Sequence, residues 1–405
     1  MARRPPLDGI RVADFTWVWA GPFCTLQLAH LGAEVIRVET ATRPCVTRML
    51  PPWADGEFGI NRSGYFNQYN QGKLSLSLDL KQPEAVKVAK DLVAKSDLVC
   101  ENFAAGVMDR MGLGYDVLRQ VKPNIIMIAL SGYGASGPER EFVSYGPAQV
   151  PLSGMSSLTG YAGWPPMHVG ISYGDPTGGL HGAFVVLAAL LYRQRTGRGQ
   201  FIDLSQQETT IATLAEGVMD YTMNRTQAPR RGNRDPGMAP HGVFRCAGEQ
   251  RWVAIAVRDD AEWQRLARIM ERPDLASEAR FAHLVDRKAN EDAVEAAVTA
   301  WTQQHSPEDV TRILQAARIP AFTSFSNKDL AEDPHLNDGD FFVRLEHPEV
   351  GARQHIGIPY HFSETPCAVQ RPAPQLGHST DQVLSDILGY SADQIARLRG
   401  AHVLT

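Results

Sequence analysis

Cysteine is scarce in this chain, and the few cysteines form no recognisable pattern. Five occur among 405 residues, widely spaced and odd in number, with no Cys-x-x-Cys and no zinc-ligand spacing. This excludes a disulfide-rich scaffold and gives no support to a metal site. The expectation is a reduced protein of the cytoplasm. The cysteines are Cys24, Cys45, Cys100, Cys246 and Cys367.

Long hydrophobic runs and an excess of charge of one sign are also missing. The longest apolar run, Ala183–Tyr192, has ten residues, whereas a membrane span needs about twenty. The N-terminus has no long apolar segment of the kind that secretory signals contain. The 40 basic and 45 acidic residues leave a net charge of −5, which is too mild to indicate a nucleic-acid binder. We therefore expect neither nucleic-acid nor membrane partners.

Several catalytic signatures are absent from the sequence. Gly132–Gly137 is rich in glycine, but no Lys-Ser or Lys-Thr follows it, so it is not a P-loop. Gly21–Pro22 lacks the Gly-x-Gly-x-x-Gly fingerprint and is more typical of a plain helix start. Neither His-Glu-x-x-His nor Gly-x-Ser-x-Gly occurs. Zinc-hydrolase, serine-hydrolase and P-loop chemistry are therefore unsupported.

The sequence does contain a regular alternation of strand and helix patterns over its first 130 residues. This alternation is typical of parallel α/β units, whose ligands bind beyond the carboxyl ends of the strands. We expect strands over 10–15, 34–39, 73–80, 97–100 and 124–130, and helices over 21–31, 82–95 and 115–121.

The middle of the chain changes character. Residues 150–174 are rich in Gly, Ser and Pro and are expected to be irregular, and an apolar helix is predicted over 176–194. Segment 225–240, with four arginines and three prolines, marks a domain boundary. We predict an α/β protein with three segments: a large Rossmann-like domain with a parallel sheet over 1–224, a linker and smaller α+β domain over 225–325, and a return segment over 326–405 that completes the large domain.

Asp175 is the most suggestive single position. An aspartate before Pro176 is a standard helix N-cap, worth about 1 kcal/mol, and caps are far commoner than nucleophilic carboxylates. The alternative is that the helix dipole and free backbone amides keep the carboxylate ionised, so that it serves as a nucleophile. In that case the glycines around it leave room for a substrate, and backbone amides in a Gly178–Gly179 turn would stabilise an oxyanion.

Taken together, several ordered motifs resemble the class III coenzyme A transferases. This family includes formyl-CoA transferase, carnitine CoA-transferase and α-methylacyl-CoA racemase. The similarity spans essentially the whole chain. The matching segments are Leu7–Thr16, Ala20–Pro22, Leu31–Glu39, Asn70–Lys73, Leu78–Asp79, Glu101–Phe103, Met108–Gly112, Gly174–Gly179, Thr196–Gln200 and Leu376–Asp381.

The resemblance implies a nucleophilic role for Asp175, with coenzyme A as a substrate and no resident cofactor or metal. It also implies two chains interlocked as rings, either a homodimer or a heteromer with a homologous subunit. The active site would then form where the large domain of one chain meets the small domain of the other. The residues implied to lie along CoA are Val18, Trp19, Ala20, Arg37, Asn102, Phe103 and Arg110.

Two departures from the family pattern bear on the reaction. Trp19 stands where the oxalate-handling relative has a glutamine, so a larger and less polar acyl group is expected. The racemase branch has a proton-transferring histidine in the segment that here reads Tyr145–Pro147, which argues against racemisation. A racemase with an unidentified second base and a catalytically silent partner subunit remain as alternatives, although the presence of Asp175 argues against the silent subunit.

These considerations lead to one expected reaction. CoA would pass from a succinyl-CoA-like donor to a bulky or aryl-substituted dicarboxylic acid, such as a benzylsuccinate-like acid, through an aspartyl anhydride and an aspartyl-CoA thioester. Trp17, Tyr161 and Trp164 would add aromatic surface to the pocket. Arginines of the 225–234 loop would hold the second carboxylate.

Overall fold

The computed structural model describes residues 4–339 and 341–405, which form two compact units. The first unit holds residues up to Ser156, His168–Gln227 and Asn337–Thr405, and the second holds Ser157–Met167 and Ala228–Leu336. The second unit therefore extends beyond residue 325, where the smaller domain was predicted to end, and it also includes the earlier segment Ser157–Met167. Backbone contacts explain this: the Gly232 N–H donates to the Gly160 carbonyl at 2.8 Å, and Arg230 Nε donates to the Trp164 carbonyl at 2.9 Å.

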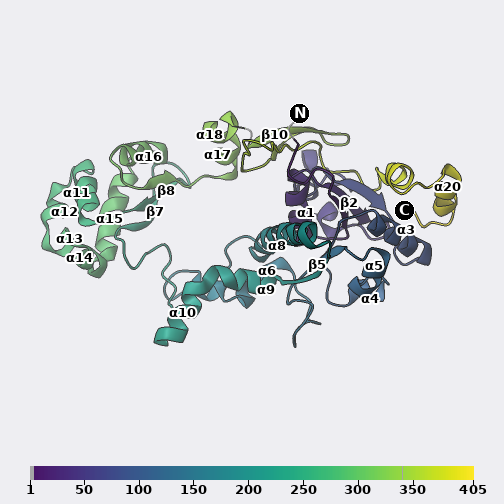
Figure 1. The fold of residues 1–405 in the computed structure, drawn as a ribbon. Helices are drawn as coiled ribbons and strands as arrows, with labels where there is room; N and C mark the ends of the chain where they lie inside the picture. Colours follow the sequence, from purple (N-terminus) through teal and green to yellow (C-terminus); the bar gives the residue numbers. More distant parts are fainter. Residues whose placement is uncertain (1–3, 340) are drawn as a thin grey trace. The chain divides into compact units, whose positions relative to one another are not determined.

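The first unit is built on a six-stranded parallel sheet in the order β3-β2-β1-β4-β5-β6. Figure 1 labels two of its strands, β2 and β5. Val12 pairs with Val35 on one side and with Leu98 on the other. The order reverses between β1 and β4, which is where open α/β sheets bind ligands. The predicted α/β fold with a parallel sheet is confirmed. The strands are β1 (Arg11–Asp14), β2 (Glu34–Glu39), β3 (Leu74–Ser77), β4 (Leu98–Glu101), β5 (Ile126–Ser131) and β6 (Phe201–Ser205).

Helices cover both faces of this sheet, because its central strands are apolar on both sides. On one face α1 (Ala20–His30) and α8 (Gly174–Thr196) share a core that includes Leu28 and Val186. On the other face α3 (Pro83–Ala94) and α5 (Tyr115–Val121) pack against a second core. The α8 helix comes close to α1, since a Cβ added at Gly179 would lie 2.8 Å from the Ala20 carbonyl oxygen.

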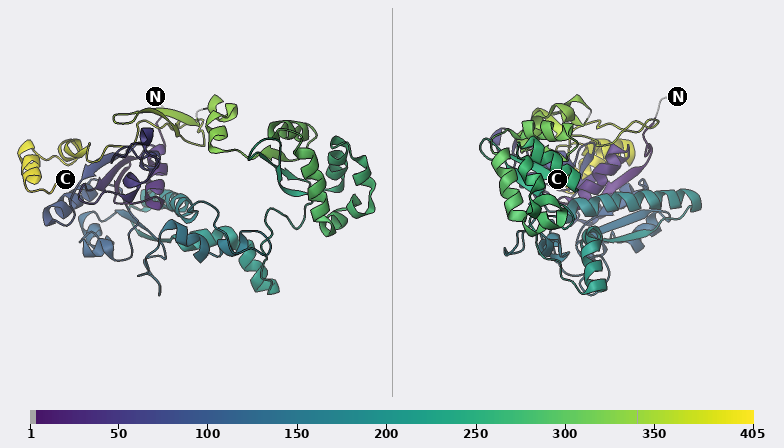
Figure 2. Two further views of the ribbon diagram at one scale, coloured as in Figure 1. Left: turned by 180° about the vertical axis from the view of Figure 1, so that it is seen from behind. Right: turned by 90° about the vertical axis from the view of Figure 1, so that its left-hand side faces the viewer.

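The C-terminal segment returns to the first unit (Figure 2). It contains the hairpin β10 (Phe342–His347) and β11 (Gly351–Ile356), then α19 (Thr380–Gln382), a π-helical turn at Val383–Ile387, and α20 (Ala392–Gly400). The Ser379 N–H donates to the Ser75 carbonyl at 3.0 Å, and the Tyr390 hydroxyl donates to Asp91 at 2.6 Å. These bonds hold the segment against β3 and α3.

Between β5 and β7 the chain is more helical than expected. The region predicted to be irregular contains parts of α6 (Gly146–Leu152) and α7 (Met155–Leu158). After β6 the chain forms α9 (Gln206–Ile211), a 3₁₀ turn and α10 (Ala215–Asn224). In the described residues no helix is long and apolar enough to cross a bilayer. Those same residues bring no three His, Cys, Asp or Glu side chains together as a metal site.

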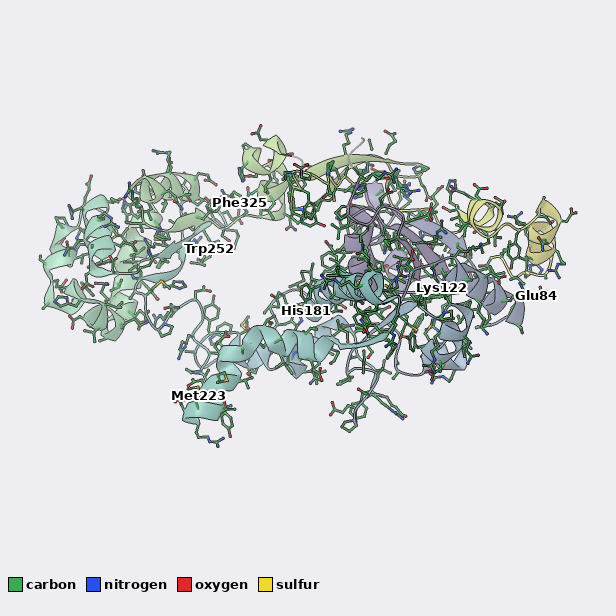
Figure 3. All side chains as sticks on the ribbon, viewed as in Figure 1. Glu84, Lys122, His181, Met223, Trp252 and Phe325 are labelled. Atoms are coloured by element: carbon green, nitrogen blue, oxygen red, sulfur yellow. The ribbon has the colours of Figure 1, made fainter. Side chains whose placement is uncertain are left out.

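The second unit combines a three-stranded antiparallel sheet with helices. Trp252 lies on the middle strand, and Phe325 follows the last one (Figure 3). Three helices of four to six residues over 273–289 were not predicted, because such short helices show too little periodicity. The elements are β7 (His241–Arg245), β8 (Trp252–Ala256), β9 (Ala321–Thr323), α11 (Asp260–Ile269), α12 (Pro273–Ser277), α13 (Ala279–Ala282), α14 (Leu284–Ala289), α15 (Glu291–Thr302), α16 (Pro307–Ala316), α17 (Asn327–Glu332) and, ending in the first unit, α18 (Pro334–Asp338).

Candidate active site

A cavity of about 1110 Å³ opens at the carboxyl end of the parallel sheet. The segments that follow β1, β2, β3, β4 and β5 all contribute to its wall, and Asp175 lies in it as well. It exceeds the usual upper size of about 1,000 Å³ for small-molecule pockets. The cavity can therefore accept an elongated ligand whose reactive end meets Asp175.

Asp175 is not the helix N-cap that the Asp-Pro pair predicted. The cap residue is Tyr173, and Asp175 is the second residue of α8. Its side chain is buried, and burial raises its pKa to about 7, while a hydrogen bond from the Ala20 backbone N–H opposes that shift. Burial therefore opposes the ionised form that the helix dipole was expected to favour. At neutral pH both protonation states of Asp175 are populated.

A glycine allows the tight fit around this carboxyl group. A Cβ added at Gly146 would lie 1.6 Å from Asp175 Oδ2, so no larger residue fits there without displacing the carboxyl group. His181 is not a partner of Asp175: its Nδ1 lies 2.9 Å from the Thr177 carbonyl of its own helix (Figure 3).

The expected Gly178–Gly179 turn does not exist. Both residues lie inside α8, and the helical bonding pattern begins at Thr177, whose N–H donates to the Tyr173 carbonyl at 3.2 Å. Amides in a helix interior are already used by the residues four positions earlier. They cannot form an oxyanion hole, and the glycines instead allow close packing against Gln206 and the Ala20 carbonyl.

The turn after β1 brings backbone groups to the cavity. Asn102 holds this turn: its Oδ1 accepts from the Trp17 N–H at 2.6 Å, and its Nδ2 donates to the Trp17 carbonyl at 2.8 Å. The following residue, Val18, has a φ of 62°, which is unfavourable for a β-branched side chain. Its N–H donates to Cys45 Sγ at 3.3 Å. Asn102 and Val18 both line the cavity, and Ala20 directs its amide to Asp175.

Aromatic and cationic side chains also line the cavity. The rings of Trp17 and Phe103 lie 6.3 Å apart, and the Arg43 guanidinium lies 5.5 Å from the Trp17 ring. Arg110, from α4 (Val107–Arg110), also lines the wall. The sequence analysis did not identify Arg43, which follows β2 in an exposed segment. Lys81 and Lys90 complete the cationic lining.

Arg37 does not line the cavity, contrary to expectation. Its side chain has no exposed surface, and its Nε lies 3.6 Å from Glu39 Oε2. Nη1 donates to Asn70 Oδ1 at 3.1 Å. Arg37 belongs to a strand buried on both faces, so its charge is balanced inside the core and is not offered to a ligand.

An aromatic cluster beside Asp175 was also missed, apart from Trp19. It comprises Trp19, Phe23, and the two tyrosines of α2 (Gly64–Tyr69), Tyr65 and Tyr69, with ring centroids 5.1 to 5.8 Å apart. Burial, with a smaller contribution from the Asp175 charge, raises the pKa of both tyrosines. The only signal in the sequence was the pair of tyrosines four residues apart on one helix face.

The remaining aromatic residues expected at the pocket lie elsewhere in the fold. Tyr161 and Trp164 pack on each other in the second unit, with ring centroids 5.8 Å apart. Trp19 is buried and begins α1 as its cap residue. Its ring packs within the aromatic cluster, on Tyr65 and Tyr69, and is not part of the cavity wall.

Comparison with known proteins assigns this arrangement to a family. A family model described as CoA-transferase family III matches residues 7–380. The succinyl-CoA–D-citramalate CoA-transferase of Chloroflexus aurantiacus is 31% identical over the full length of both chains. The beta subunit of that organism's succinyl-CoA–L-malate CoA-transferase is 33% identical over 98% of both chains.

The fold agrees with that assignment. The crystal structure of a CaiB/BaiF family protein from Brucella suis superposes with a TM-score of 0.87 at 28% identity, covering 95% of this chain and 100% of that one. The family model spans most of the chain, and the relatives match it from end to end. The chain belongs to CoA-transferase family III and is a CoA-transferase.

Proposed function

We propose that this enzyme transfers CoA from succinyl-CoA to a bulky or aryl-substituted dicarboxylic acid, with Asp175 as the nucleophile. One observation carries the proposal: a buried carboxyl group lines a large cavity and lies near the tyrosines of an aromatic cluster. The succinyl-CoA donor is supported by the two relatives above, both of which are named as succinyl-CoA-dependent CoA-transferases.

The chemistry follows from a carboxylate in this position. Asp175 attacks the thioester carbonyl of the donor, which forms a mixed anhydride and releases CoA thiolate. The thiolate attacks the Asp175 carbonyl, so the donor leaves as a free carboxylate and an aspartyl-CoA thioester remains. The acceptor carboxylate displaces the thiolate and forms a second anhydride. The thiolate then attacks the acceptor carbonyl, giving the new acyl-CoA and free Asp175. Covalent catalysis of this kind divides one difficult exchange into easier steps.

The cavity wall supports a specific placement of CoA. Trp17 and Phe103 would contact its adenine, and the cations Arg43 and Arg110 would meet its phosphates. The backbone at Val18 would lie along the thiol-bearing arm. The Ala20 N–H already donates to the Asp175 carboxyl group, so it would also be close to the developing oxyanion.

The aromatic cluster supports a bulky acyl group. Its rings provide apolar surface with edge-to-face geometry next to the reacting carboxyl group, which suits an aryl substituent. For the second carboxylate, Arg230 and Arg234 are already bonded within their own unit, to backbone carbonyls and to Glu295. Arg225, which belongs to the same unit as Asp175, is therefore the better candidate for that carboxylate.

Racemisation receives no support from the site. It needs a second base beside the α-carbon, and the residue that comes closest to Asp175 from the relevant segment is Gly146, which has no side chain. Asp175 itself is present, which also disfavours a catalytically silent subunit.

We further propose that two chains associate, as a homodimer or with a homologous subunit. The α10 helix exposes Val218, Met219, Tyr221 and Met223, which is an unusual apolar surface for a free helix (Figure 3). Light scattering coupled to size exclusion will give the mass in solution. Met223→Glu should shift an assembled species toward the 44.5 kDa chain, and a monomeric wild type would contradict the proposal.

The decisive experiment incubates the protein with succinyl-CoA and an equimolar panel of benzylsuccinate, itaconate, oxalate and carnitine, and follows the CoA esters by mass spectrometry. We expect benzylsuccinyl-CoA to dominate. Asp175→Asn should abolish exchange, and hydroxylamine added during turnover should modify Asp175. The matched control is Asp393→Asn, because Asp393 is also the second residue of its helix but lies on the surface. Preference for oxalate or carnitine, or turnover by Asp175→Asn, would refute the proposal.

A further inference from the structure

Lys73 is an ammonium group with no exposed surface, held by four oxygen atoms. Its Nζ lies 3.2 Å from Asp14 Oδ2, 3.0 Å from the Pro22 carbonyl, 2.7 Å from Thr25 Oγ1 and 3.0 Å from Asn70 Oδ1. Burying a charge in this way is costly unless every donor is satisfied. The mechanism proposed above does not use Lys73, which lies outside the cavity wall.

The hydrogen bonds around Lys73, with Asp14, Pro22, Thr25 and Asn70, form one network. On one side this network holds the turn between β1 and α1. Asp14 Oδ1 accepts from the Thr16 N–H at 2.9 Å, and its Oδ2 accepts from the Thr25 hydroxyl at 2.8 Å. Lys73 also donates a hydrogen bond to the Pro22 carbonyl, which lies in the first turn of α1. This is the turn that begins with Ala20, whose N–H donates to Asp175.

On the other side the network holds α2. Asn70 caps the end of this helix, and its Nδ2 donates to the Phe66 carbonyl at 3.0 Å. Its Oδ1 accepts from both Lys73 and Arg37. The same helix carries Tyr65 and Tyr69, the two tyrosines whose pKa the Asp175 charge raises.

The two elements that approach Asp175 are thus tied to each other through one buried cation. Arg37 is the second cation of the network, and Glu39 lies 3.6 Å from it and also pairs with the buried Arg48. Replacing buried ion pairs by apolar residues is often neutral or stabilising. A network of this kind is therefore better explained by the geometry it imposes than by stability alone.

We propose that Lys73 is a positioning residue for the nucleophile: it holds the Ala20 amide and the α2 tyrosines in register around Asp175. This inference rests on the proposed role of Asp175. A purely structural Lys73 would lower stability on replacement without changing how Asp175 titrates or reacts.

The test compares two double variants. Asp14→Asn/Lys73→Met removes the Asp14–Lys73 ion pair while keeping side-chain size. The control Asp97→Asn/Arg193→Met removes an ion pair of 3.0 Å at the opposite end of the sheet. Both are assayed for kcat, for KM and for the pH dependence of kcat/KM, alongside thermal unfolding. We expect the first variant to lose at least tenfold in kcat, with its acid limb displaced to higher pH because the Ala20 amide is no longer held. The control should keep both its kcat and the pH of its acid limb.

A milder variant keeps the test informative if the first does not fold. Thr25→Val removes one hydroxyl from the network and leaves no buried charge unpaired, and it should show a smaller loss of kcat with the same displacement of the acid limb. Asp175→Asn in the same assay separates the two proposals, since its activity would refute the nucleophile itself. An inactive Asp175→Asn together with unchanged kcat and pH profiles in the network variants would refute the positioning role alone.

Discussion

Asp175 should make the enzyme less stable at the pH where it works. Burial raises its pKa from 3.8 to about 7, so the folded state binds the proton more tightly than the unfolded state does. Stability from this group is therefore complete below pH 3.8 and is lost as the pH rises toward 7. A shift of about three units corresponds to roughly 4 kcal/mol at pH 8. About 2 kcal/mol of this stabilising contribution is already lost at pH 5.

Asp175→Asn tests this because the amide has the same shape and no charge. Its carbonyl oxygen can still accept the Ala20 N–H. We expect the variant to be more stable than the wild type in urea unfolding at pH 8, and the advantage to shrink by about 2 to 3 kcal/mol at pH 5. The variant should have no activity at either pH. A variant that is less stable than wild type at pH 8, or an advantage that does not change with pH, would refute the reasoning.

Four further outcomes are expected. In the wild type, kcat/KM should fall about tenfold per pH unit below 7, as the nucleophile protonates; a flat pH profile down to 5 would contradict this. Gly146→Ala should abolish turnover, because its Cβ would overlap the Asp175 carboxyl group; full activity would show that the carboxyl group moves freely. Arg110→Met should raise KM for CoA esters about tenfold with little change in kcat, whereas Arg37→Met should leave KM unchanged and cost about 1 to 3 kcal/mol of stability, since it removes the buried hydrogen bond to Asn70 while Glu39 keeps Arg48 as its partner; steady-state kinetics and urea unfolding distinguish the two. Trp19→Ala should reduce the preference for aryl-substituted acceptors over itaconate in the competition assay, and an unchanged ratio would remove Trp19 from acyl recognition.

The strands of the parallel sheet, and the helices that alternate with them along the chain, could be predicted from the sequence because they depend on local patterns. Apolar runs such as Ile126–Ser131 are long enough and separated clearly enough to be recognised as buried strands. Family motifs also identified Asp175, Asn102 and Phe103, which the structure brings to one cavity. Short helices over 273–289 escaped prediction, since packing rather than periodicity stabilises them.

The tertiary structure alone decided the environment of each group. The Gly178–Gly179 pair resembled a turn in the sequence, but it lies inside α8 because close packing on α1 requires small residues. Arg37 was expected to lie along CoA, but its strand is buried on both faces, and its guanidinium contacts Glu39 on the same strand and Asn70 from another segment.

The same distinction separates the position of the proposed nucleophile from its chemistry. The Gly-Asp-Pro motif marks that carboxylate as a candidate, because residue type and order are properties of the chain. Its pKa, its Ala20 amide and its tyrosines depend on desolvation and on contacts between segments more than 100 residues apart. Lys73 makes the same point: its motif is visible in the sequence, but only the fold brings Asp14, Pro22 and Asn70 around one ammonium group. Electrostatic energies depend on distances in space and on burial, and neither can be derived from positions along the chain.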